Sequence, residues 1–539
     1  MKNNIDVLII GSGGAGLSAA LNAKKNNSKV LVVSKTFPTH SQTVQAQGGI
    51  NAVLYEDNDS INNHINDTYN ASHSLSNKNN ISFLCKNAKD TILWLDSIGV
   101  PFNRTEEGKF SQRKFGGTKY LRTCYSSDYT GLKIMHTLFD QCIKENIEFY
   151  NEHFLLELIT KNSICKGAIF LDIKSGDIIT IYAKTIILAT GGYTGIYSNN
   201  TTNSYSNSAD GIAVAFRAGV ILSNMEFVQF HPTTLLNSNI LISESARGEG
   251  AYLVDKDGNR FIDELKSRDE VTKAIYERIL NKEDIFLDLR HLGLDKINEL
   301  IPQERKLAFE FSNIKIEEEL LPIIPSAHYS MGGIKTNING ETNLTNLFAV
   351  GECANASIHG ANRLGGNSLL EIVTLGKHIG TYVSNKAKYI AIFDEKISNQ
   401  EIKTKEKISE FYEKKSEINF YKIKDYLSNK LFEDVGIFKE RNKLIEFQNI
   451  INDISKDINK MGIEDKSKIY NKNLIDLLEF LNILLVSKLV VLSSLNREES
   501  RGSHFRIDFP NKDISYNKSS SIQLINDEIV FKFEEEDEN

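Results

Sequence analysis

Residues 11–16 read Gly-Ser-Gly-Gly-Ala-Gly and stand between the apolar run of residues 5–10 and the small-residue stretch of residues 17–21. A strand, a glycine turn and a helix in this order hold a pyrophosphate. The first glycine permits the turn, the second admits the phosphates, and the third lets the helix pack on the strand. N–H groups at the helix N-terminus attract the anion. Because the strand and the helix are both readable, the stretch predicts a dinucleotide site rather than an ordinary glycine turn.

Length and composition indicate a soluble protein of several domains. The chain has 539 residues, of which 41% are hydrophobic and 25% charged, and its net charge is −7. A single core stops growing at about 250 to 300 residues, so two or more domains are expected. An acidic balance offers no general field for nucleic acid. Five cysteines without a C-x-x-C pair predict neither a metal site nor disulfides, and they suit a reducing compartment.

The sequence gives no sign of export or membrane insertion. No charged-then-apolar leader precedes Ile5, so we expect a cytoplasmic protein. Residues 474–495 approach the ~20 residues that span a bilayer. They contain Asp476, Glu479, Asn482 and Lys488, which favour a buried helix over a membrane span.

Strand-like segments lie far apart in the chain. Residues 29–33 complete a βαβ start, whereas residues 178–189 and 347–352 supply further glycine-bounded strands much later. A sheet that contains them all must be interrupted by an inserted domain, which we place at residues 227–327. From residue 386 glycine becomes scarce and apolar residues recur at three and four residue steps, which predicts helices. The acidic end, residues 533–539, is typical of a solvated tail.

The segment after the second strand favours FAD over NAD. An NAD site usually places Asp or Glu about 20 residues after the glycines, to hold the ribose. Here Ser34, Lys35 and Thr36 stand in that place. Residues 39–49 are rich in small and hydrogen-bonding side chains, which suit a large polar cofactor.

With these residues in place, the chain resembles the flavoprotein subunits of succinate dehydrogenase and fumarate reductase, a family that also includes L-aspartate oxidase. The resemblance runs through nearly the whole chain. The stretches that carry it are SKTFPTHSQTVQAQGGI (34–50), LATGGYTGIYSNNTTNSYSNSADG (188–211), FVQFHPT (227–233), SARGEGAYL (245–253), PSAHYSMGG (325–333), FAVGEC (348–353), HGANRLGGNSLLE (359–371) and REESRGSHF (497–505).

The resemblance implies an α/β fold, in which a Rossmann-like FAD-binding domain carries an inserted α+β capping domain and is followed by a C-terminal helical domain. The expected division is an FAD-binding domain at residues 1–226 and 328–385, a capping domain at 227–327, a helical domain at 386–499, and a C-terminal segment with an acidic tail at 500–539.

The resemblance also implies hydride exchange between the flavin and a four-carbon dicarboxylate. Arg363 matches the family's carboxylate-binding arginine, and a guanidinium fork suits a carboxylate. The other residues that match the family's substrate contacts are His231, Ser243 and His328. Outside such motifs a histidine is more often a core or surface residue than a ligand.

Three further residues match the family's proton relay. Arg268 matches the arginine that protonates the substrate carbon in fumarate reduction. Arginine normally keeps its proton, so a neighbour must reload it at once. Glu244 and Arg247 match that relay, and the alternative interpretation is a surface ion pair.

The FAD contacts implied by the resemblance involve the glycine turn, the segment after the second strand and two later motifs. Asp210 and Glu352 could instead be turn and helix-cap residues. The expected contacts are Gly11, Ser12, Gly13, Gly14, Ala15, Gly16, Ser34, Lys35, Ser41, Gln42, Thr43, Gln47, Gly48, Gly49, Asp210, Glu352, Ser368 and Leu369.

One departure from the family concerns the flavin linkage. Membrane-bound respiratory members carry a covalently flavinylated histidine at the position of Gln42, and His40 lies two residues earlier. We therefore expect non-covalent FAD. Without the linkage the flavin potential is lower, so fumarate reduction is favoured over succinate oxidation.

L-aspartate oxidase, which makes iminoaspartate for NAD biosynthesis, is the main alternative. It also binds FAD non-covalently, and it discriminates the amino group by a glutamate where this chain has Phe115. Loss of such a charged hydrogen bond is worth about 1.5 to 3 kcal/mol. Together with the Phe-Pro-Thr at residues 37–39, Phe115 favours the succinate and fumarate enzymes.

Two other classes of flavoprotein are alternatives, and the resemblance implies partner subunits. A non-catalytic flavin-binding partner protein would lack catalytic residues, and a tRNA-modifying flavoprotein would need a basic face. Neither fits. The resemblance implies an iron-sulfur subunit and a quinone-reactive membrane subunit, which would place the chain at the inner face of the cytoplasmic membrane. We expect no bound metal, no nucleic acid and no membrane insertion of this chain.

Overall fold

The computed structural model describes residues 2–57, 59–391, 393 and 399–535. It opens with the predicted βαβ unit: β1 (Lys2–Ile10), α1 (Gly14–Lys25) and β2 (Val30–Val33). β1 pairs in parallel with β2 on one side and with β9 (Ile178–Leu188) on the other. The side chains of β1 from Ile5 onward are buried except for the partly exposed Asp6, which explains why the other residues of this run are apolar.

The main sheet joins strands that are far apart in the chain. Its order is β6-β2-β1-β9-β8-β7, and β16 (Leu347–Ala349) also pairs with β9 in parallel. The other strands are β6 (Glu148–Tyr150), β7 (His153–Lys161) and β8 (Ile164–Asp172). The chain is therefore a mixed α/β protein whose first sheet closes only after residue 347.

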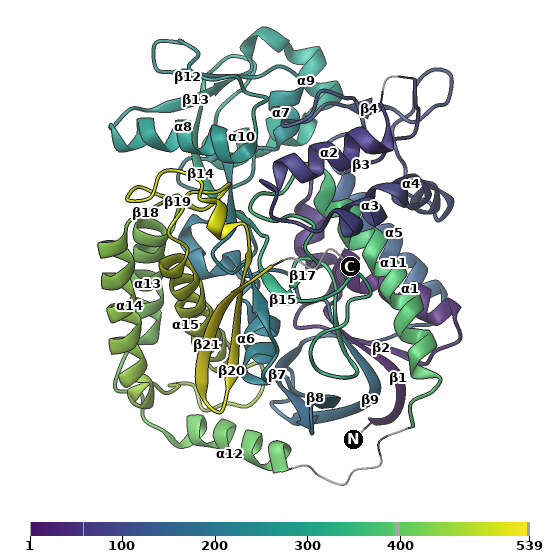
Figure 1. Cartoon of the computed structure of the whole chain (residues 1–539), viewed down its shortest axis with the longest axis vertical. Helices are drawn as coiled ribbons and strands as arrows, with labels where there is room; N and C mark the ends of the chain where they lie inside the picture. The colour runs from purple at the N-terminus through teal and green to yellow at the C-terminus, as the bar shows by residue number, and fades with distance from the viewer. Residues whose placement is uncertain (1, 58, 392, 394–398, 536–539) are drawn as a thin grey trace.

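Two long helices cover one face of this sheet (Figure 1). α1 packs along α11 (Asn367–Ala387), and glycines make the approach close. A Cβ atom at Gly380 would lie 2.3 Å from the carbonyl oxygen of Ala19. Further helices on this side of the chain are α2 (Ile61–Ala71), α3 (Lys78–Lys86), α4 (Ala88–Ser97) and α5 (Thr130–Lys144), with a small sheet of β3 (Ile50–Asn51), β5 (Thr123–Cys124) and β4 (Gln112–Arg113).

A four-stranded antiparallel sheet with its own core stands at the top of Figure 1, in teal. We call it the cap. Its strand order is β11-β14-β13-β12. Its elements are β11 (Val228–Leu235), α7 (Glu244–Gly248), β12 (Tyr252–Asp255), α8 (Arg268–Leu280), β13 (Ile285–Asp288), α9 (Leu294–Leu300), α10 (Pro302–Ser312) and β14 (Leu321–Ser330).

Another sheet brings the chain's end back to its middle. In the order β17-β15-β10-β20-β21 it pairs β10 (Leu222–Ser223) with β20 (Ser519–Ile525). The remaining strands are β15 (Gly333–Lys335), β17 (Ala354–Asn355) and β21 (Glu528–Glu534). The predicted solvated tail is therefore wrong for Phe533 and Glu534, because both pair with β20. Residues 536–539 of the acidic run lie outside the described residues.

The predicted helical region forms the left side of Figure 1. Its helices are α12 (Asn399–Glu413), α13 (Phe420–Val435), α14 (Arg441–Lys456) and α15 (Lys472–Asn496), and between them β18 (Phe438–Lys439) pairs with β19 (Phe505–Arg506). α15 is largely buried, which confirms the buried helix predicted at residues 474–495. Among the described residues no helix has the length and apolarity to cross a membrane.

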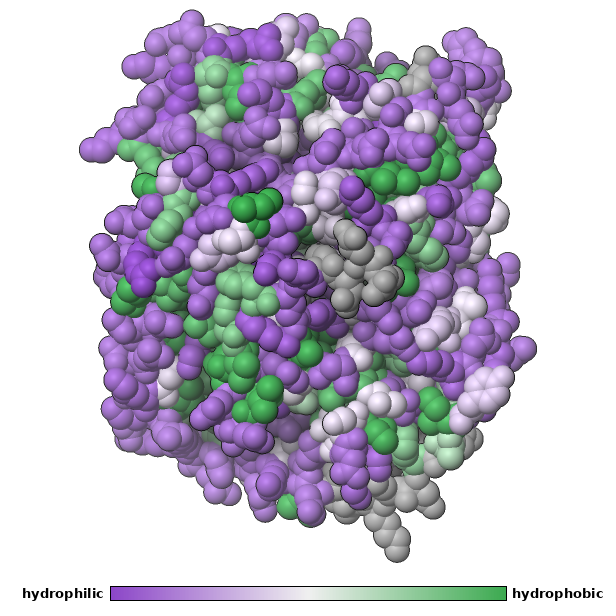
Figure 2. Space-filling view, in the orientation of Figure 1, coloured by the Kyte–Doolittle hydropathy of each residue, from purple (hydrophilic) through white to green (hydrophobic). Residues whose placement is uncertain are grey.

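Short elements connect these units, and α6 (Asp210–Arg217) follows the long loop after β9. The face shown in Figure 2 is mostly hydrophilic, and its apolar residues gather only in small groups. The 3-10 elements are Pro38–His40, Gln42–Gln45, Thr194–Asn200, which is kinked at Ser198, Arg290–Leu292, Ile458–Lys460 and Ile514–Tyr516.

Candidate active site

A large cleft opens at the carboxyl ends of the parallel strands. Its lining includes Ile10 at the end of β1, Ser34 just after β2, Ala189 just after β9 and Val350 just after β16. The empty space in the cleft, together with its opening to solvent, is about 1740 Å³. Ligands bind at this edge of open α/β sheets. Every predicted site residue lines the cleft except Gly16 and Arg247.

The glycine turn divides into two roles. A Cβ atom on Gly16 would lie 2.1 Å from the carbonyl oxygen of Gly11, so Gly16 serves the packing of α1 on β1. A Cβ atom on Gly13 would meet nothing closer than 3.6 Å, the Oγ1 atom of Thr43. The backbone at Gly13 therefore faces the cleft, at the N-terminus of α1, where a phosphate would be attracted.

Lys35 anchors the end of β2 at the side of the cleft. Its Nζ atom lies 2.6 Å from Asp210 Oδ2, 2.8 Å from Glu479 Oε1 and 2.8 Å from Ser208 Oγ. Burial alone would lower the pKa of Lys35, but the two carboxylates outweigh it and raise that pKa. Glu479, on α15, could not be assigned from the sequence because no local motif marks it.

The loop of residues 41–49 follows the cleft wall. Gln42 Oε1 accepts a hydrogen bond from Ser204 N at 3.0 Å, while its amide donates to Gln45. Gly48 lies against the ring of Phe115, and a Cβ atom there would lie 2.5 Å from that ring. These contacts fix the position of the loop in the cleft wall.

Buried polar atoms in the cleft wall fit a large polar cofactor. Gln47 Oε1, Asn203 Oδ1 and both amide atoms of Asn207 are buried and have no hydrogen-bond partner among the described residues. Unsatisfied buried polar groups are costly, so they indicate a ligand rich in hydrogen-bonding groups. FAD, with its adenosine, pyrophosphate and ring, has that character.

Two buried arginines meet at the cap side of the cleft. Arg268 is at the start of α8, and its Nη1 atom donates to Gln229 Oε1 at 3.0 Å. Arg363 Nη2 donates to the same oxygen at 3.0 Å. Glu244 Oε2 accepts from Arg268 Nε at 2.7 Å, and Glu244 Oε1 accepts from Gly116 N at 2.7 Å. One carboxylate therefore faces a pair of guanidinium groups.

The electrostatics of this group follow from its burial. Desolvation would raise the pKa of Glu244, but Arg268 and Arg247 lower it below its usual range, so the carboxylate is charged. Desolvation and the repulsion of Arg268 lower the pKa of Arg363 to about 10. The site holds more positive than negative charge and suits an anionic ligand.

His231 and His328 lie together, with ring centroids 5.0 Å apart, and both line the cleft. His328 Nδ1 lies 2.8 Å from Thr202 Oγ1. Burial and the neighbouring Arg268 lower the pKa of both histidines well below its usual value. Both rings are therefore neutral near pH 7 and can serve as hydrogen-bonding groups beside the arginines.

Arg247 lies behind the cleft wall. Its Nη1 donates to Glu264 O at 2.6 Å, while Nε and Nη2 have no hydrogen-bond partner among the described residues. Ser243 caps the same short helix α7, donates its backbone N–H to Glu304 at 3.0 Å, and lines the cleft. Arg247 and Arg268 both act on Glu244 through their charges, although only Arg268 forms an ion pair with it among the described residues.

A second layer of polar residues was missed by sequence reasoning. Gln229 bridges the two arginines, and Tyr329 places its ring 4.3 Å from the Arg363 guanidinium. Gln229 is two residues before His231 and Tyr329 is next to His328. Alternation along β11 was the signal that could have found Gln229, because residues i and i+2 share a strand face, whereas no periodicity marks Tyr329.

The comparisons agree with this geometry. A family model described as FAD binding domain matches residues 6–369, and one described as fumarate reductase flavoprotein C-term matches residues 424–535. The chain is 36% identical to the succinate dehydrogenase flavoprotein subunit of Rickettsia bellii, covering 95% of this chain and 91% of that one. It is 37% identical to the 8-methylmenaquinol:fumarate reductase flavoprotein subunit of Wolinella succinogenes, covering 94% and 86%.

Solved structures are similar over the whole chain. A mutant form of E. coli quinol fumarate reductase FrdA superposes with a TM-score of 0.93 at 30% identity, covering 98% of this chain and 96% of that one. These relatives carry the names of succinate dehydrogenase and fumarate reductase subunits, and neither family description names L-aspartate oxidase. The chain is an FAD-binding protein and belongs to the family of succinate dehydrogenase and fumarate reductase flavoprotein subunits.

Proposed function

We propose that this chain interconverts fumarate and succinate and that it works in the direction of fumarate reduction. The observation that carries the proposal is the pair of buried guanidinium groups, Arg268 and Arg363, which share Gln229 Oε1 in the same cleft as the glycine turn. When bound, FAD supplies two-electron hydride chemistry beside them.

Arg363 would hold one carboxylate of the substrate. Its Nε atom is buried and has no hydrogen-bond partner among the described residues, so the guanidinium keeps a donor for a ligand. Tyr329 supports its face from behind. The neutral rings of His231 and His328, with Ser243, would bind the second carboxylate through hydrogen bonds.

Arg268 would deliver the proton to the substrate carbon. Since a guanidinium gives up its proton reluctantly, the group that passes a new proton to it must be in contact. Glu244 is in contact with Arg268 at 2.7 Å. Arg247 acts on Glu244 through its charge and keeps two side-chain donors without a partner among the described residues. The order Arg268, Glu244, Arg247 therefore leads from the cleft to the interior of the cap.

Burial strengthens each of these interactions. Arg268 is 8% exposed and Glu244 1% exposed, so water competes weakly with the substrate for them. Most of the rate would come from holding the substrate between charged groups that need no rearrangement.

The FAD is proposed to be non-covalent, because Gln42 stands where flavinylated relatives carry histidine and its amide is engaged by Ser204 and Gln45. His40 lines the cleft two residues earlier in the sequence and is exposed, so we propose that it does not replace the histidine of those relatives. We propose that electrons come from an iron-sulfur subunit and a quinone-reactive membrane subunit, and the name of the Wolinella relative, an 8-methylmenaquinol:fumarate reductase flavoprotein subunit, supports a quinol as the electron source. The chain would then lie at the cytoplasmic face of the membrane through those partners.

The test is an assay of the purified holoprotein with fumarate and a reduced viologen dye, with aspartate as the second arm. Dye oxidation that depends on fumarate is expected. Formation of iminoaspartate from aspartate, without fumarate reduction, would establish the oxidase instead. Phe115 predicts against that outcome, because an ammonium group would meet an apolar ring in the cleft.

A further inference from the structure

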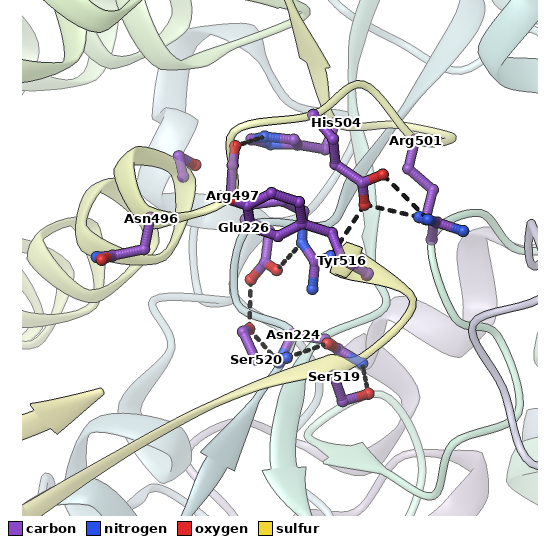
Figure 3. A network of polar contacts seen from close by, with 12 residues as sticks. Asn224, Glu226, Asn496, Arg497, Arg501, His504, Tyr516, Ser519 and Ser520 are labelled. Carbon is purple, nitrogen blue, oxygen red and sulfur yellow. Dashed lines mark hydrogen bonds and ion pairs between the residues drawn. The ribbon is translucent and has the colours of Figure 1, made fainter. Parts of the chain in front are cut away.

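The motif of residues 497–505 lies outside the cleft and yet is held by buried charges (Figure 3). Arg497 Nε lies 2.6 Å from Glu226 Oε1, and its Nη1 lies 3.0 Å from Glu499 Oε1. Arg501 Nε lies 2.7 Å from the same Glu499 oxygen. Such buried ion pairs add little stability over apolar packing, whereas their geometry is strict. The motif is therefore a candidate for a positioning role.

The ion pairs hold the two points at which the chain enters and leaves the cap. Phe227 precedes β11 and Met331 follows β14, and Met331 N donates to Phe227 O at 3.1 Å. The Arg497 guanidinium lies 4.9 Å from the centre of the Phe227 ring, and His504 meets that ring edge-on at 6.1 Å. Residues 497–504 thus pack on the hinge of the cap.

From the same motif a contact leads toward the active site. Arg501 Nη1 donates to His73 O at 3.0 Å. Gly502 follows, and a Cβ atom there would lie 2.9 Å from His73 Cδ2, so glycine is needed for this approach. The position of His73 is thereby set by the C-terminal motif.

His73 reaches across to the cap. Its Nε2 lies 3.0 Å from Asp269 Oδ2, and Asn362 Nδ2 donates to Asp269 Oδ1 at 3.1 Å. Asp269 is next to Arg268 at the start of α8. Both carboxylate oxygens are thus held by groups from the FAD-binding part of the chain, one residue away from the arginine of the proton relay.

The arginines fix which side-chain atoms donate and which accept along these hydrogen bonds. Arginines can only donate, so Gln229 presents Oε1 to Arg268 and Arg363 and donates through Nε2 to Asn362 Oδ1 at 2.8 Å. Asn362 must then turn its amide N–H toward Asp269. A carboxylate at Asp269 therefore orders the acceptor that the arginines share.

We propose that His73 is a positioning residue that latches Asp269, and with it Arg268, to the C-terminal motif. The inference rests on the proposed function for its kinetic part. With the latch closed, α8 holds the Arg268 guanidinium at the cleft, and the ion pairs of residues 497–501 hold His73 in reach of Asp269.

The test compares His73→Asn with His73→Gln. His73 has φ +55°, a left-handed conformation that asparagine tolerates, so His73→Asn keeps the turn. Its amide nitrogen reaches only as far as the histidine Nδ1, short of Asp269. The nitrogen of glutamine reaches as far as Nε2. The two variants differ by one methylene and separate the latch from mere removal of the ring.

The expected result is a tenfold to hundredfold lower kcat for fumarate in His73→Asn, because Arg268 loses its position, with kcat and kcat/KM falling together. His73→Gln should recover most of that loss. Hydrogen exchange of the α8 amides, measured with and without added FAD, should be faster in His73→Asn and close to wild type in His73→Gln.

Wild-type kcat in His73→Asn would overturn the inference, as would unchanged α8 exchange in that variant. Failure of His73→Gln to restore either quantity, at a wild-type melting temperature, would also overturn it. A wild-type protein inactive with fumarate would refute the proposed function instead, and the exchange measurement would still decide the latch.

Discussion

Glu244→Gln tests the proton relay most directly. The side chain is 1% exposed and accepts from Arg268 Nε and from Gly116 N, both at 2.7 Å, while Arg268 Nη2 also lies 2.7 Å from it. Glutamine has the same shape and no charge. Its amide places a donor or a weaker acceptor opposite the Arg268 guanidinium.

The magnitude follows from the contacts. A hydrogen bond to a charged group is worth about 1.5 to 3 kcal/mol, and Arg268 makes two to Glu244. A loss of about 3 to 6 kcal/mol in the transition state corresponds to a fall in kcat of roughly 10² to 10⁴. KM should change much less, because Arg363 and the histidines still bind the substrate.

The assay is fumarate-dependent dye oxidation by purified holoprotein, with the flavin content and the melting temperature measured on each preparation. Glu317→Gln is the matched control, since Glu317 also lies in the cap and pairs with an arginine, Arg305, at 2.6 Å, but away from the cleft. It should keep wild-type kcat. A Glu244→Gln enzyme with full flavin content and a kcat within tenfold of wild type would refute the relay.

Three further predictions concern the cofactor and pH. Gly13→Ala should fold but bind FAD about tenfold or more weakly, because its methyl group displaces phosphate hydrogen bonds. Gly16→Ala should fail to fold, because its methyl group would lie 2.1 Å from the carbonyl oxygen of Gly11. The flavin content tests the first variant and the yield of folded protein tests the second. Burial raises the pKa of Glu352 to about 7, so the folded protein keeps a proton that the unfolded chain releases near pH 4.5. Between pH 5 and pH 8 the free energy of unfolding of the wild type should therefore fall by about 2 to 3 kcal/mol more than that of Glu352→Gln. The same pH dependence in the denaturation curves of both proteins would disprove this. Acid precipitation should leave the flavin in solution, since Gln42 cannot form the linkage, and a yellow pellet would contradict this.

The local patterns of the chain predicted its regular elements well. The apolar run before residue 11 and the glycines that follow it are adjacent in sequence, so strand, turn and helix could be recognised together. The mixed α/β fold was also predicted, and so was the buried helix at residues 474–495, because apolar side chains make up most of that segment. The prediction of a solvated tail was wrong for Phe533 and Glu534, since the long-range pairing of β21 with β20 outweighs the local charge.

The site was predictable only where motifs mark it. Arg268, Glu244 and Arg363 were predicted by resemblance, and the structure brings them into one cleft from α8, α7 and the turn before α11. His73 and Glu479 were not found. Both act through tertiary contacts with residues about 200 or more positions away, and no periodicity in a single sequence reports such contacts.

The pairing of β10 with β20 has a consequence for biosynthesis. Leu222 and Ile522 are partners although 300 residues separate them, and the cap is made in between. While the ribosome is still adding the helical region, the nascent polypeptide carries an open edge at β10 and a cap without its C-terminal support. Such edges invite aggregation. The folding of this chain is therefore complete only once β20 and β21 have been made.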